Sequence, residues 1–407
     1  MKRRMIAVLL SGILLCSAAG CGKEAVTDKS TAASSSQEVT ETPAAEESPE
    51  ASSSSADSTA ESASASTSSE SSGDEGKEAD KKRIEITVPH KDGMEALYDT
   101  VDGLTVEKGS YIAVVAKDLS AGFWKAVKAG AQQALDDLNA SLGYTGNDKV
   151  YMTFEGPENE SDTNSQINII DSVISENPDA LILGIIDQQS GQAQMEEASD
   201  SQIPVVIADS GIESDLITST CATDHAAAAK LAADHLCEAI GNSGEVAIVA
   251  HQYNTESSVE RVEAFKKTRS KKNYTDVKVV QVNYGDGEES IADMLKNTLE
   301  TYPALKGIFC TNEDMADQTL DALADMENTE QIQIVGFDSG EKQQKAIQEG
   351  REYGTVTQNP YGLGYAAIVA AVRAIQGLPV DQKIDTGYQW LDKDTIDLET
   401  NQKYLYN

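Results

Sequence analysis

Histidine, cysteine and basic residues are scarce in this chain of 407 residues. It has four histidines, five cysteines, and 32 Lys and Arg against 68 Asp and Glu, which gives a formal net charge of −36. An acidic surface is unsuited to nucleic acid, because phosphate contacts require clustered Lys and Arg. Without a CxxC or HExxH pattern, the few cysteines and histidines leave little material for a metal site. We therefore expect no metal, no cofactor and no nucleic-acid partner.

Long apolar runs are also missing after the first 20 residues, so no later segment predicts a membrane span. The chain begins with three basic residues, a short apolar stretch and small residues that end on Cys21. This layout is typical of a secretory signal peptide. The small residues before Cys21 resemble the lipobox of bacterial lipoproteins, although Ala18 stands where Leu is usual. We expect residues 1–20 to be a lipoprotein signal peptide and Cys21 to be lipidated; the alternative is an ordinary signal with an incidental cysteine.

Aromatic residues are absent between Cys21 and Asp80, and 12 of the 22 residues at 51–72 are serine. Such a segment buries too little apolar surface to offset the entropy lost on ordering. We expect residues 21–83 to form a flexible acidic tether between a membrane and an extracytoplasmic domain. Because the rest of the chain is also acidic, the lipid anchor rather than a basic patch would hold it at the membrane.

From residue 111 onward, short β-branched runs alternate with amphipathic segments of helical length, which predicts a βα-repeating α/β fold. Apolar strands between helices are typical of parallel sheets covered on both faces. Their number favours two doubly wound lobes over one open sheet. Residues 84–107 precede the first core strand as an N-terminal extension. The predicted strands are 111–116, 150–154, 180–186, 204–208, 245–250, 277–282, 307–310, 332–337 and 353–357.

Polar and aromatic residues follow these strands, where open α/β sheets bind their ligands. The dinucleotide, P-loop and nucleophile-elbow patterns are all missing, and no catalytic constellation is visible, so we do not expect an enzyme. Carboxylates and amides hydrogen-bond hydroxyl groups, while aromatic rings cover the apolar face of a sugar. This mixture favours a small polyhydroxylated ligand.

Several segments, taken in order, resemble one family. They are VVAKDLSAGFWKAVKAGAQQA, NPDALILGIID, IPVVIADSG, SSVERVEAFKK, IFCTNEDMADQTLDAL, IVGFDSGEKQQKAI and GTVTQNPYGLGYAAI. The chain, from about residue 108 to 395, is similar to periplasmic sugar-binding proteins of the ribose/galactose-binding type, the substrate-binding components of ABC transporters.

The resemblance implies a type I periplasmic binding protein fold, with two lobes joined by a three-strand hinge. Lobe 1 would comprise residues 108–223 and 359–386, and lobe 2 residues 224–357 and 387–407. The chain would cross between them near Thr223, Gln358 and Gly387. A monomer would close around a monosaccharide or related polyol and deliver it to a membrane permease. The alternative is a sensor that presents a sugar-like signal molecule to a membrane receptor kinase.

The family pattern also implies roles for seven residues. Two aromatic residues would stack on the ligand, and the others would supply carboxylate, guanidinium and amide groups. These residues are Phe123, Trp124, Asp209, Arg261, Asn312, Asp338 and Gln358. Ser210 departs from the arginine of the ribose binders and Ala121 from a polar residue, so the resemblance favours a sugar-like ligand without specifying ribose.

Structural alternatives exist at several of these positions. Asp338 and Asn312 each precede a predicted helix and could be N-caps. Arg261 could be a solvated ion-pair partner of a neighbouring glutamate. The aromatic pair could belong to the core, although adjacent residues at a helix start point in different directions. Cys221, Cys237 and Cys310 are either buried thiols or include one disulfide.

Overall fold

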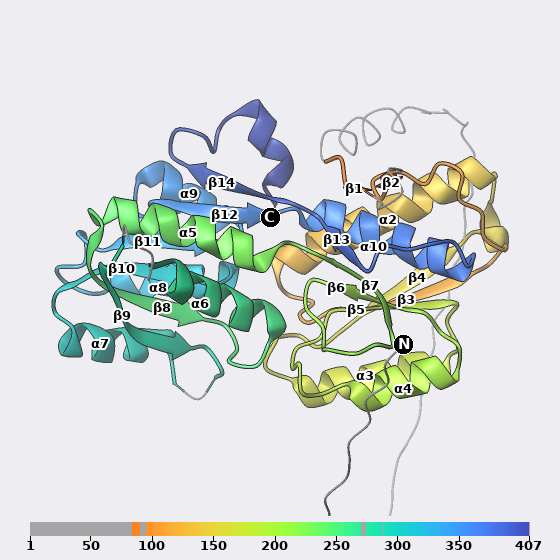
Figure 1. Cartoon of the computed structure of the whole chain (residues 1–407), viewed down its shortest axis with the longest axis horizontal. Helices are drawn as coiled ribbons and strands as arrows, with labels where there is room; N and C mark the ends of the chain where they lie inside the picture. The colour runs from red at the N-terminus through yellow and green to blue at the C-terminus, as the bar shows by residue number, and fades with distance from the viewer. Residues whose placement is uncertain (1–83, 90–94, 270–273, 288, 407) are drawn as a thin grey trace, which may run out of the picture. The chain divides into compact units, whose positions relative to one another are not determined.

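The computed structural model describes residues 84–89, 95–269, 274–287 and 289–406 (Figure 1). The predicted signal peptide, Cys21 and the whole of the predicted tether lie outside these residues. Within the described part, no helix combines the length and the apolar character needed to cross a membrane.

Lobe 1 is built on a six-stranded sheet with the strand order β13-β7-β6-β5-β3-β4, in which all neighbouring strands are parallel. Its elements are β3 (Tyr111–Val115), α2 (Gly122–Leu142), β4 (Tyr151–Glu155), α3 (Thr163–Ser175), β5 (Ala180–Leu183), α4 (Gln192–Asp200), β6 (Val205–Ala208), β7 (Ile217–Ala222), α10 (Pro360–Ile375) and β13 (Lys383–Asp385). Alternate residues of β3 face opposite layers: Ile112 and Val114 pack with α2 and α10, whereas Ala113 and Val115 pack with α3 and α4. Because successive side chains point to opposite faces, helices cover both faces of the sheet.

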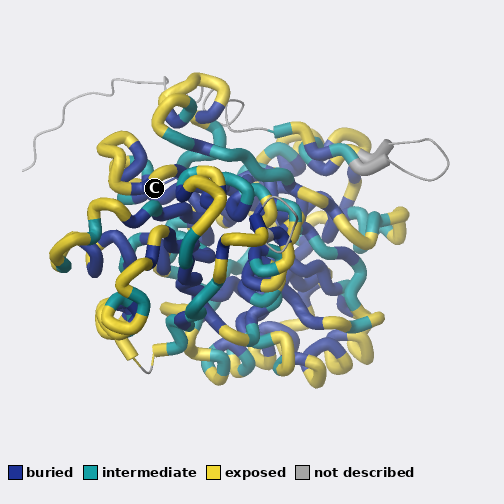
Figure 2. The backbone as a smooth tube through the Cα atoms, turned by 60° about the vertical axis from the view of Figure 1, so that its left-hand side comes forward, coloured by how far each residue is buried: buried dark blue, intermediate teal, exposed yellow. Residues whose placement is uncertain are grey.

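Lobe 2 has a similar six-stranded sheet with the strand order β14-β12-β11-β10-β8-β9, in which all neighbouring pairs are parallel except β12 and β14. Its elements are α5 (His225–Ala239), β8 (Ser243–Ala250), α6 (Glu256–Arg269), β9 (Asp276–Tyr284), α7 (Ile291–Thr301), β10 (Leu305–Cys310), α8 (Glu313–Ala324), β11 (Gln333–Phe337), α9 (Glu341–Glu349), β12 (Gly354–Gln358) and β14 (Tyr388–Asp392). Helices α5 and α6 pack with one set of strand residues, and α7, α8 and α9 with the other. The inner strands are buried, the edge strands β9 and β14 are partly exposed, and the outer helix surfaces are exposed (Figure 2).

The described chain passes between the two sheets at three places. β7 of lobe 1 leads into α5 of lobe 2, β12 leads back into α10, and β13 is followed two residues later by β14. β14 pairs antiparallel with β12, with Tyr388 opposite Gln358. The crossings thus lie side by side at one edge of both sheets (Figure 1).

The segment before β3 packs on lobe 1. β1 (Thr87–Pro89) and β2 (Glu95–Leu97) form a two-stranded antiparallel ribbon. Ile86 and Tyr98 are buried in the same apolar cluster as α2 and α10. The Tyr98 hydroxyl donates to Asp381 Oδ2 at 2.7 Å. This buried hydroxyl fastens the extension to the loop that leads into β13.

Three cysteines lie in the described residues, and all three are free and buried. The expectation of buried thiols is thus confirmed over a disulfide. Burial raises the pKa of Cys237 to about 12 and raises those of Cys221 and Cys310 above their usual range. Such thiols are poor nucleophiles because little thiolate forms near neutral pH.

All nine predicted strands are present, with ends shifted by up to a few residues. Besides the short strands β1 and β2, sequence reasoning missed β7, β13 and β14. The run of β7, ITSTCA, is polar and has half-exposed residues, and β13 has only three residues. Short edge strands carry little of the apolar pattern that identifies a core strand. The antiparallel direction of β14 was also not predicted.

Candidate functional site

A cavity of about 350 Å³ opens between the carboxyl ends of the strands of the two lobes. Such a volume suits a small ligand. The structure brings all seven predicted site residues to its lining: Phe123, Trp124, Asp209, Arg261, Asn312, Asp338 and Gln358.

Asp209 follows β6 and has a left-handed backbone, with φ of 71°. Asp338 follows β11 in the same way, with φ of 78°. A non-glycine residue in this region costs free energy and persists only where surrounding contacts hold it. Both carboxyl groups are nearly inaccessible to solvent. Each lobe therefore directs one aspartate from an equivalent strand end into the same cavity.

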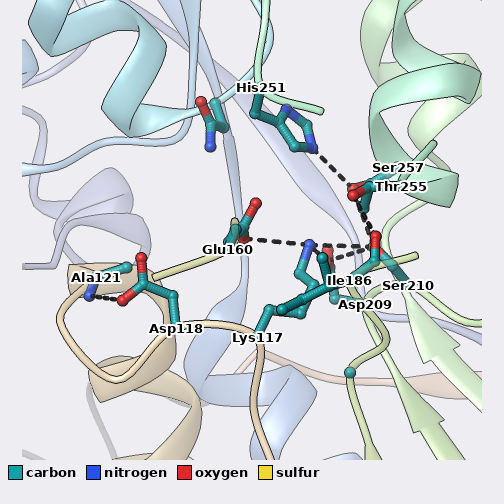
Figure 3. Close-up of polar contacts among 12 residues, drawn as sticks. Lys117, Asp118, Ala121, Glu160, Ile186, Asp209, Ser210, His251, Thr255 and Ser257 are labelled. Atoms are coloured by element: carbon teal, nitrogen blue, oxygen red, sulfur yellow. Dashed lines mark hydrogen bonds and ion pairs between the residues drawn. The ribbon is translucent and has the colours of Figure 1, made fainter. Parts of the chain in front are cut away.

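Lys117 lies beside Asp209, with Nζ 2.9 Å from its Oδ2 (Figure 3). The same ammonium group is 3.3 Å from Glu160 Oε1 and 3.2 Å from Ser210 Oγ. Burial alone would lower the pKa of Lys117, but Asp209 and Glu160 raise it above its ordinary value. Burial opposes ionisation of Asp209, yet Lys117 and the neighbouring cationic groups hold its pKa well below its usual range. Lys117 and Asp209 are thus a buried ion pair.

Arg261, in the second turn of α6, is 2% exposed. Its guanidinium donates to the Thr311 carbonyl at 2.7 Å and lies 3.8 Å from Asp209 Oδ1. The group also covers the Phe337 ring, 3.7 Å from the ring centroid. The alternative of a solvated helix-surface ion pair is therefore wrong.

His225 lies between Arg261 and Asp209. Its Nδ1 is 3.1 Å from an Arg261 nitrogen and its Nε2 is 3.1 Å from the Asp209 carbonyl. Burial and the Arg261 charge lower the pKa of His225 to about 4. The neutral ring accepts from the Arg261 guanidinium at Nδ1 and donates to the Asp209 carbonyl at Nε2. It therefore holds both of these candidate ligand-binding residues in place.

On the lobe 2 side, Asp338 Oδ1 accepts from Gln358 Nε2 at 2.6 Å, and Oδ2 accepts from the Glu313 backbone N–H at 3.1 Å. Asp338 thus binds the first turn of α8. The alternative that it caps the next helix is wrong, because the N-cap of α9 is Gly340. Asn312 both lines the cavity and caps α8, through its side-chain oxygen and the Met315 N–H.

On the lobe 2 side, the carboxyl groups of Glu313 and Asp338 repel each other when both are ionised. Burial and the nearby Asp338 raise the pKa of Glu313 to about 8. Burial likewise raises the pKa of Asp338, although Arg261 and the hydrogen bond from Gln358 counteract it. At least one of these two carboxyl groups should therefore be protonated near neutral pH.

Phe123 and Trp124 begin α2 and meet edge to face, with ring centroids 5.5 Å apart. Both rings line the cavity and both belong to the core of lobe 1. The ligand-contact interpretation and the core interpretation therefore do not exclude each other. The Trp124 ring fits closely against Gly184, where a Cβ atom would lie 2.3 Å from the indole. Glycine at the end of β5 is thus required to admit this ring.

Unpartnered polar atoms gather on the cavity lining. Side-chain atoms that are inaccessible to solvent and have no hydrogen-bond partner include Asp209 Oδ1, Arg261 Nε, Gln358 Oε1, Glu160 Oε2, Glu313 Oε2, Asp317 Oδ1 and Trp124 Nε1. Buried polar atoms are nearly always satisfied, so such a concentration needs an explanation. A polar ligand bound in the cavity would supply partners for these atoms.

The two lobes also bond directly to each other. Gly211 N–H donates to Glu256 Oε2 at 2.6 Å, and Gln188 N–H donates to the Asn254 carbonyl at 3.1 Å. Thr255 donates to the Ile186 carbonyl (Figure 3). The segment before and at the start of α6 therefore binds the loops after β5 and β6.

A chain of hydroxyl groups and one imidazole also crosses between the lobes. Ser210 donates to Asp209 Oδ2 at 2.8 Å, and its oxygen lies 2.9 Å from that of Ser257. Ser257 is 3.3 Å from His251 Nε2, and His251 Nδ1 is 2.8 Å from Thr311 Oγ1. Burial lowers the pKa of His251 well below its ordinary value, so the ring is neutral and can accept from one hydroxyl while donating to the other.

Sequence reasoning assigned no role to Lys117 or His251 and did not identify Glu160 or His225. Lys117 directly follows the predicted strand 111–116, and this place at a strand end was the one sequence signal for it. Glu160 lies five residues beyond β4, in a loop whose path no sequence pattern defines. Its proximity to Lys117 arises only from the fold. In the described residues, no cluster of His, Cys, Asp and Glu has the arrangement of a metal site.

Residues 112–379 match the family described as periplasmic binding protein domain. The D-allose-binding periplasmic protein of Escherichia coli (strain K12) is 25% identical over 303 residues, covering 70% of this chain and 92% of that protein. A carbohydrate transporter solute binding protein from Agrobacterium radiobacter, solved with D-arabinose, shares 27% identity at a TM-score of 0.66, covering 73% of this chain and 98% of that one. An ABC transporter solute binding protein from Agrobacterium vitis with bound D-fucose shares 26% identity at a TM-score of 0.66, with 73% and 100% coverage.

These likenesses span both lobes and the cavity between them. The fold is that of two parallel-sheet α/β lobes, as predicted, and the family consists of binding proteins rather than enzymes. With more than half of its length matched, the chain belongs to the periplasmic binding protein family.

Proposed function

We propose that the protein is an extracytoplasmic solute-binding protein that captures a monosaccharide or related polyol between its lobes and delivers it to an ABC permease. The observation that carries this proposal is the convergence of unpartnered buried polar atoms and two aromatic rings on one cavity. Hydroxyl groups of a sugar would satisfy the polar atoms while Phe123 and Trp124 cover its apolar face. The sugars in the names of its relatives and structural neighbours agree with this ligand class.

Closure about the three crossings is the proposed mechanism. Asp209 and Arg261 come from different lobes, so a ligand that contacts both holds the lobes together. We propose lobe boundaries near Thr223, Gln358 and Gly387, which are adjacent to the observed crossings. The closed form would present a surface from both lobes to the permease. No covalent chemistry and no turnover of the bound sugar are expected.

We also propose that the protein is a monomer attached to the membrane through lipidated Cys21. The basis for the lipid anchor is the sequence pattern of residues 1–21. A Cys21→Ser variant should move from the membrane to the soluble fraction, and mass spectrometry of the wild-type N-terminal peptide should show an added lipid. An unmodified Cys21 would overturn the anchor without affecting the binding function.

Calorimetry and intrinsic tryptophan fluorescence test the binding function. The purified protein should be titrated with pentoses, hexoses, polyols, nucleosides and amino acids. Trp124 lines the cavity, so occupancy should change its emission. We expect saturable binding of a sugar or polyol that is lost in Asp338→Ala. A response confined to nucleosides or amino acids would overturn the carbohydrate assignment.

A further inference from the structure

Glu160 lies on the lobe 1 side of the cavity, in the loop between β4 and α3. Its side chain is 18% exposed, and Oε1 is 3.3 Å from Lys117 Nζ. The other oxygen, Oε2, is inaccessible to solvent and has no hydrogen-bond partner. Figure 3 shows Glu160 and Asp209 on opposite sides of the Lys117 ammonium group. The cavity thus has a second, largely buried carboxyl group beside Asp209, and burial raises its pKa while the Lys117 ammonium group lowers it.

The Lys117 ammonium group has three donor hydrogens and three acceptors within reach. These acceptors are Asp209 Oδ2 at 2.9 Å, Ser210 Oγ at 3.2 Å and Glu160 Oε1 at 3.3 Å. Its side chain is 3% exposed. Lys117 therefore has no donor left for a ligand. Its charge offsets that of Asp209, whose pKa it lowers, and it counteracts the rise that burial causes in the pKa of Glu160. Its role is to fix the orientation of both carboxyl groups.

This arrangement leaves two unpartnered acceptors next to Lys117, Asp209 Oδ1 and Glu160 Oε2. A hydroxyl group of a ligand can donate to such an oxygen. A carboxylate or phosphate has no proton to donate. Beside Glu160 Oε2 it would also find no free donor on Lys117, whose three hydrogens already have acceptors, whereas the Arg261 guanidinium lies beside Asp209 Oδ1, at 3.8 Å. The Glu160 side of this end therefore favours a hydroxyl donor over an acidic group.

We propose that Glu160 is a ligand-binding and specificity-determining residue, positioned by Lys117, that selects a neutral hydroxyl donor at this end of the ligand and rejects an acidic group there. The proposal rests on the proposed sugar-binding function and deepens it. Neutral aldoses and alditols fit this requirement, whereas the corresponding sugar acids do not.

Glu160→Gln tests the proposal, because it keeps the shape of the side chain. The amide oxygen must face the Lys117 ammonium group, so the amide nitrogen takes the place of Oε2. The variant therefore converts an acceptor in the cavity into a donor. Glu158→Gln is the matched control, since Glu158 is an exposed residue of the same loop.

The purified wild type and both variants should be titrated by calorimetry with D-ribose, D-allose and D-arabinose and with the aldonate of each. We expect wild type and Glu158→Gln to prefer the neutral sugar. In Glu160→Gln, the ratio of neutral-sugar to aldonate affinity should fall at least about tenfold. A folding defect would weaken both ligands alike and leave this ratio unchanged, and thermal unfolding would reveal it.

Two results would overturn the inference and leave the binding function intact. One is a wild type that binds an aldonate more tightly than its aldose. The other is a Glu160→Gln variant that folds and retains the wild-type ratio. If folded wild type binds none of these sugars or acids, the sugar-binding function itself fails, and the inference falls with it.

Discussion

Asp209 and Asp338 begin the same tripeptide, Asp-Ser-Gly, in the two lobes. Each follows the fourth core strand of its lobe, and each has a left-handed backbone. Their environments differ. Asp209 is held ionised beside Lys117, while burial raises the pKa of Asp338. One lobe therefore offers a fixed negative charge, and the other offers a carboxyl group whose protonation can respond to the ligand.

Glu352 is a buried carboxyl group outside the cavity lining, 1% exposed, that accepts from Gln343 Nε2 at 3.2 Å. Burial raises its pKa from the ordinary 4.5 to about 8. Between these values the folded protein keeps a proton that the unfolded chain has lost. The resulting contribution to stability is complete below about pH 4.5 and is lost as the pH rises through about 8.

Glu352→Gln should therefore stabilise the protein at alkaline pH. We expect its free energy of unfolding to match that of wild type near pH 5 and to exceed it by on the order of 1 kcal/mol or more at pH 9. Denaturant unfolding at both pH values measures this difference. Glu300→Gln, an exposed residue of α7, is the control. An equal effect of Glu352→Gln at both pH values would contradict the assignment.

The site residues were accessible to sequence reasoning where they directly follow a strand or occupy a recognisable segment. Asp209, Asp338 and Gln358 lie at strand ends, and Arg261 lies in a family-like helix. Sequence could not identify the partners that set their charge. Lys117 and Glu160 meet through two separate loops, and His225 reaches Asp209 from the start of α5. These contacts depend on three-dimensional packing rather than on any local pattern.

At the scale of elements, the closest packing in lobe 1 joins α2 and α10. A Cβ atom on Gly130 would lie 1.8 Å from the Tyr361 carbonyl oxygen, and one on Gly364 would lie 1.9 Å from that of Val127. The two helices thus approach backbone to backbone at two glycines. This contact holds the returning helix α10 on lobe 1 after the chain has left lobe 2.

Gly130→Ala should destabilise the protein by several kcal/mol, because backbone atoms must move apart to admit the methyl group. Thermal or denaturant unfolding measures the loss. Ala129→Ser, at the exposed neighbouring position, adds one atom towards solvent and should change stability by less than about 0.5 kcal/mol. Equal stabilities of the two variants would show that the helices separate at little cost.

Most of the fold was predictable because apolar core strands alternate with segments of helical length. The hinge strands were not. β13 and β14 are short and mixed in polarity, and they are strands because neighbouring edges offer unpaired hydrogen-bonding groups. Their existence depends on sheets built from residues more than 20 positions away. Only the resemblance to known proteins indicated that the chain crosses a third time near Gly387.

At the scale of the whole molecule, closure depends on contacts that lie outside the cavity lining. Glu256, in the first turn of α6, accepts from the Gly211 N–H of lobe 1 at 2.6 Å. The cavity lining does not include Glu256. The hydrogen bond exists only when the lobes meet, so it stabilises the closed form in preference to an open one.

Glu256→Ala should weaken sugar binding by about tenfold, mainly by accelerating dissociation. Stopped-flow tryptophan fluorescence with the best ligand from the sugar panel separates the two rate constants. Glu263→Ala removes an exposed carboxylate from the same helix and should leave both unchanged. A dissociation rate equal to that of wild type would show that this hydrogen bond does not hold the lobes together.

The buried state of Cys221, Cys237 and Cys310 has a practical consequence for following this motion. Their thiols are shielded and poorly ionised, so a maleimide dye should leave them unmodified in the native protein. In a chain that lacks residues 1–21, and with them Cys16 and Cys21, a cysteine introduced at exposed Tyr253 would then be the preferred labelling position. A dye at that position, beside Asn254 and its contact with lobe 1, would report closure as a change in colour or brightness. The protein thus provides the basis of an optical sensor for its own ligand.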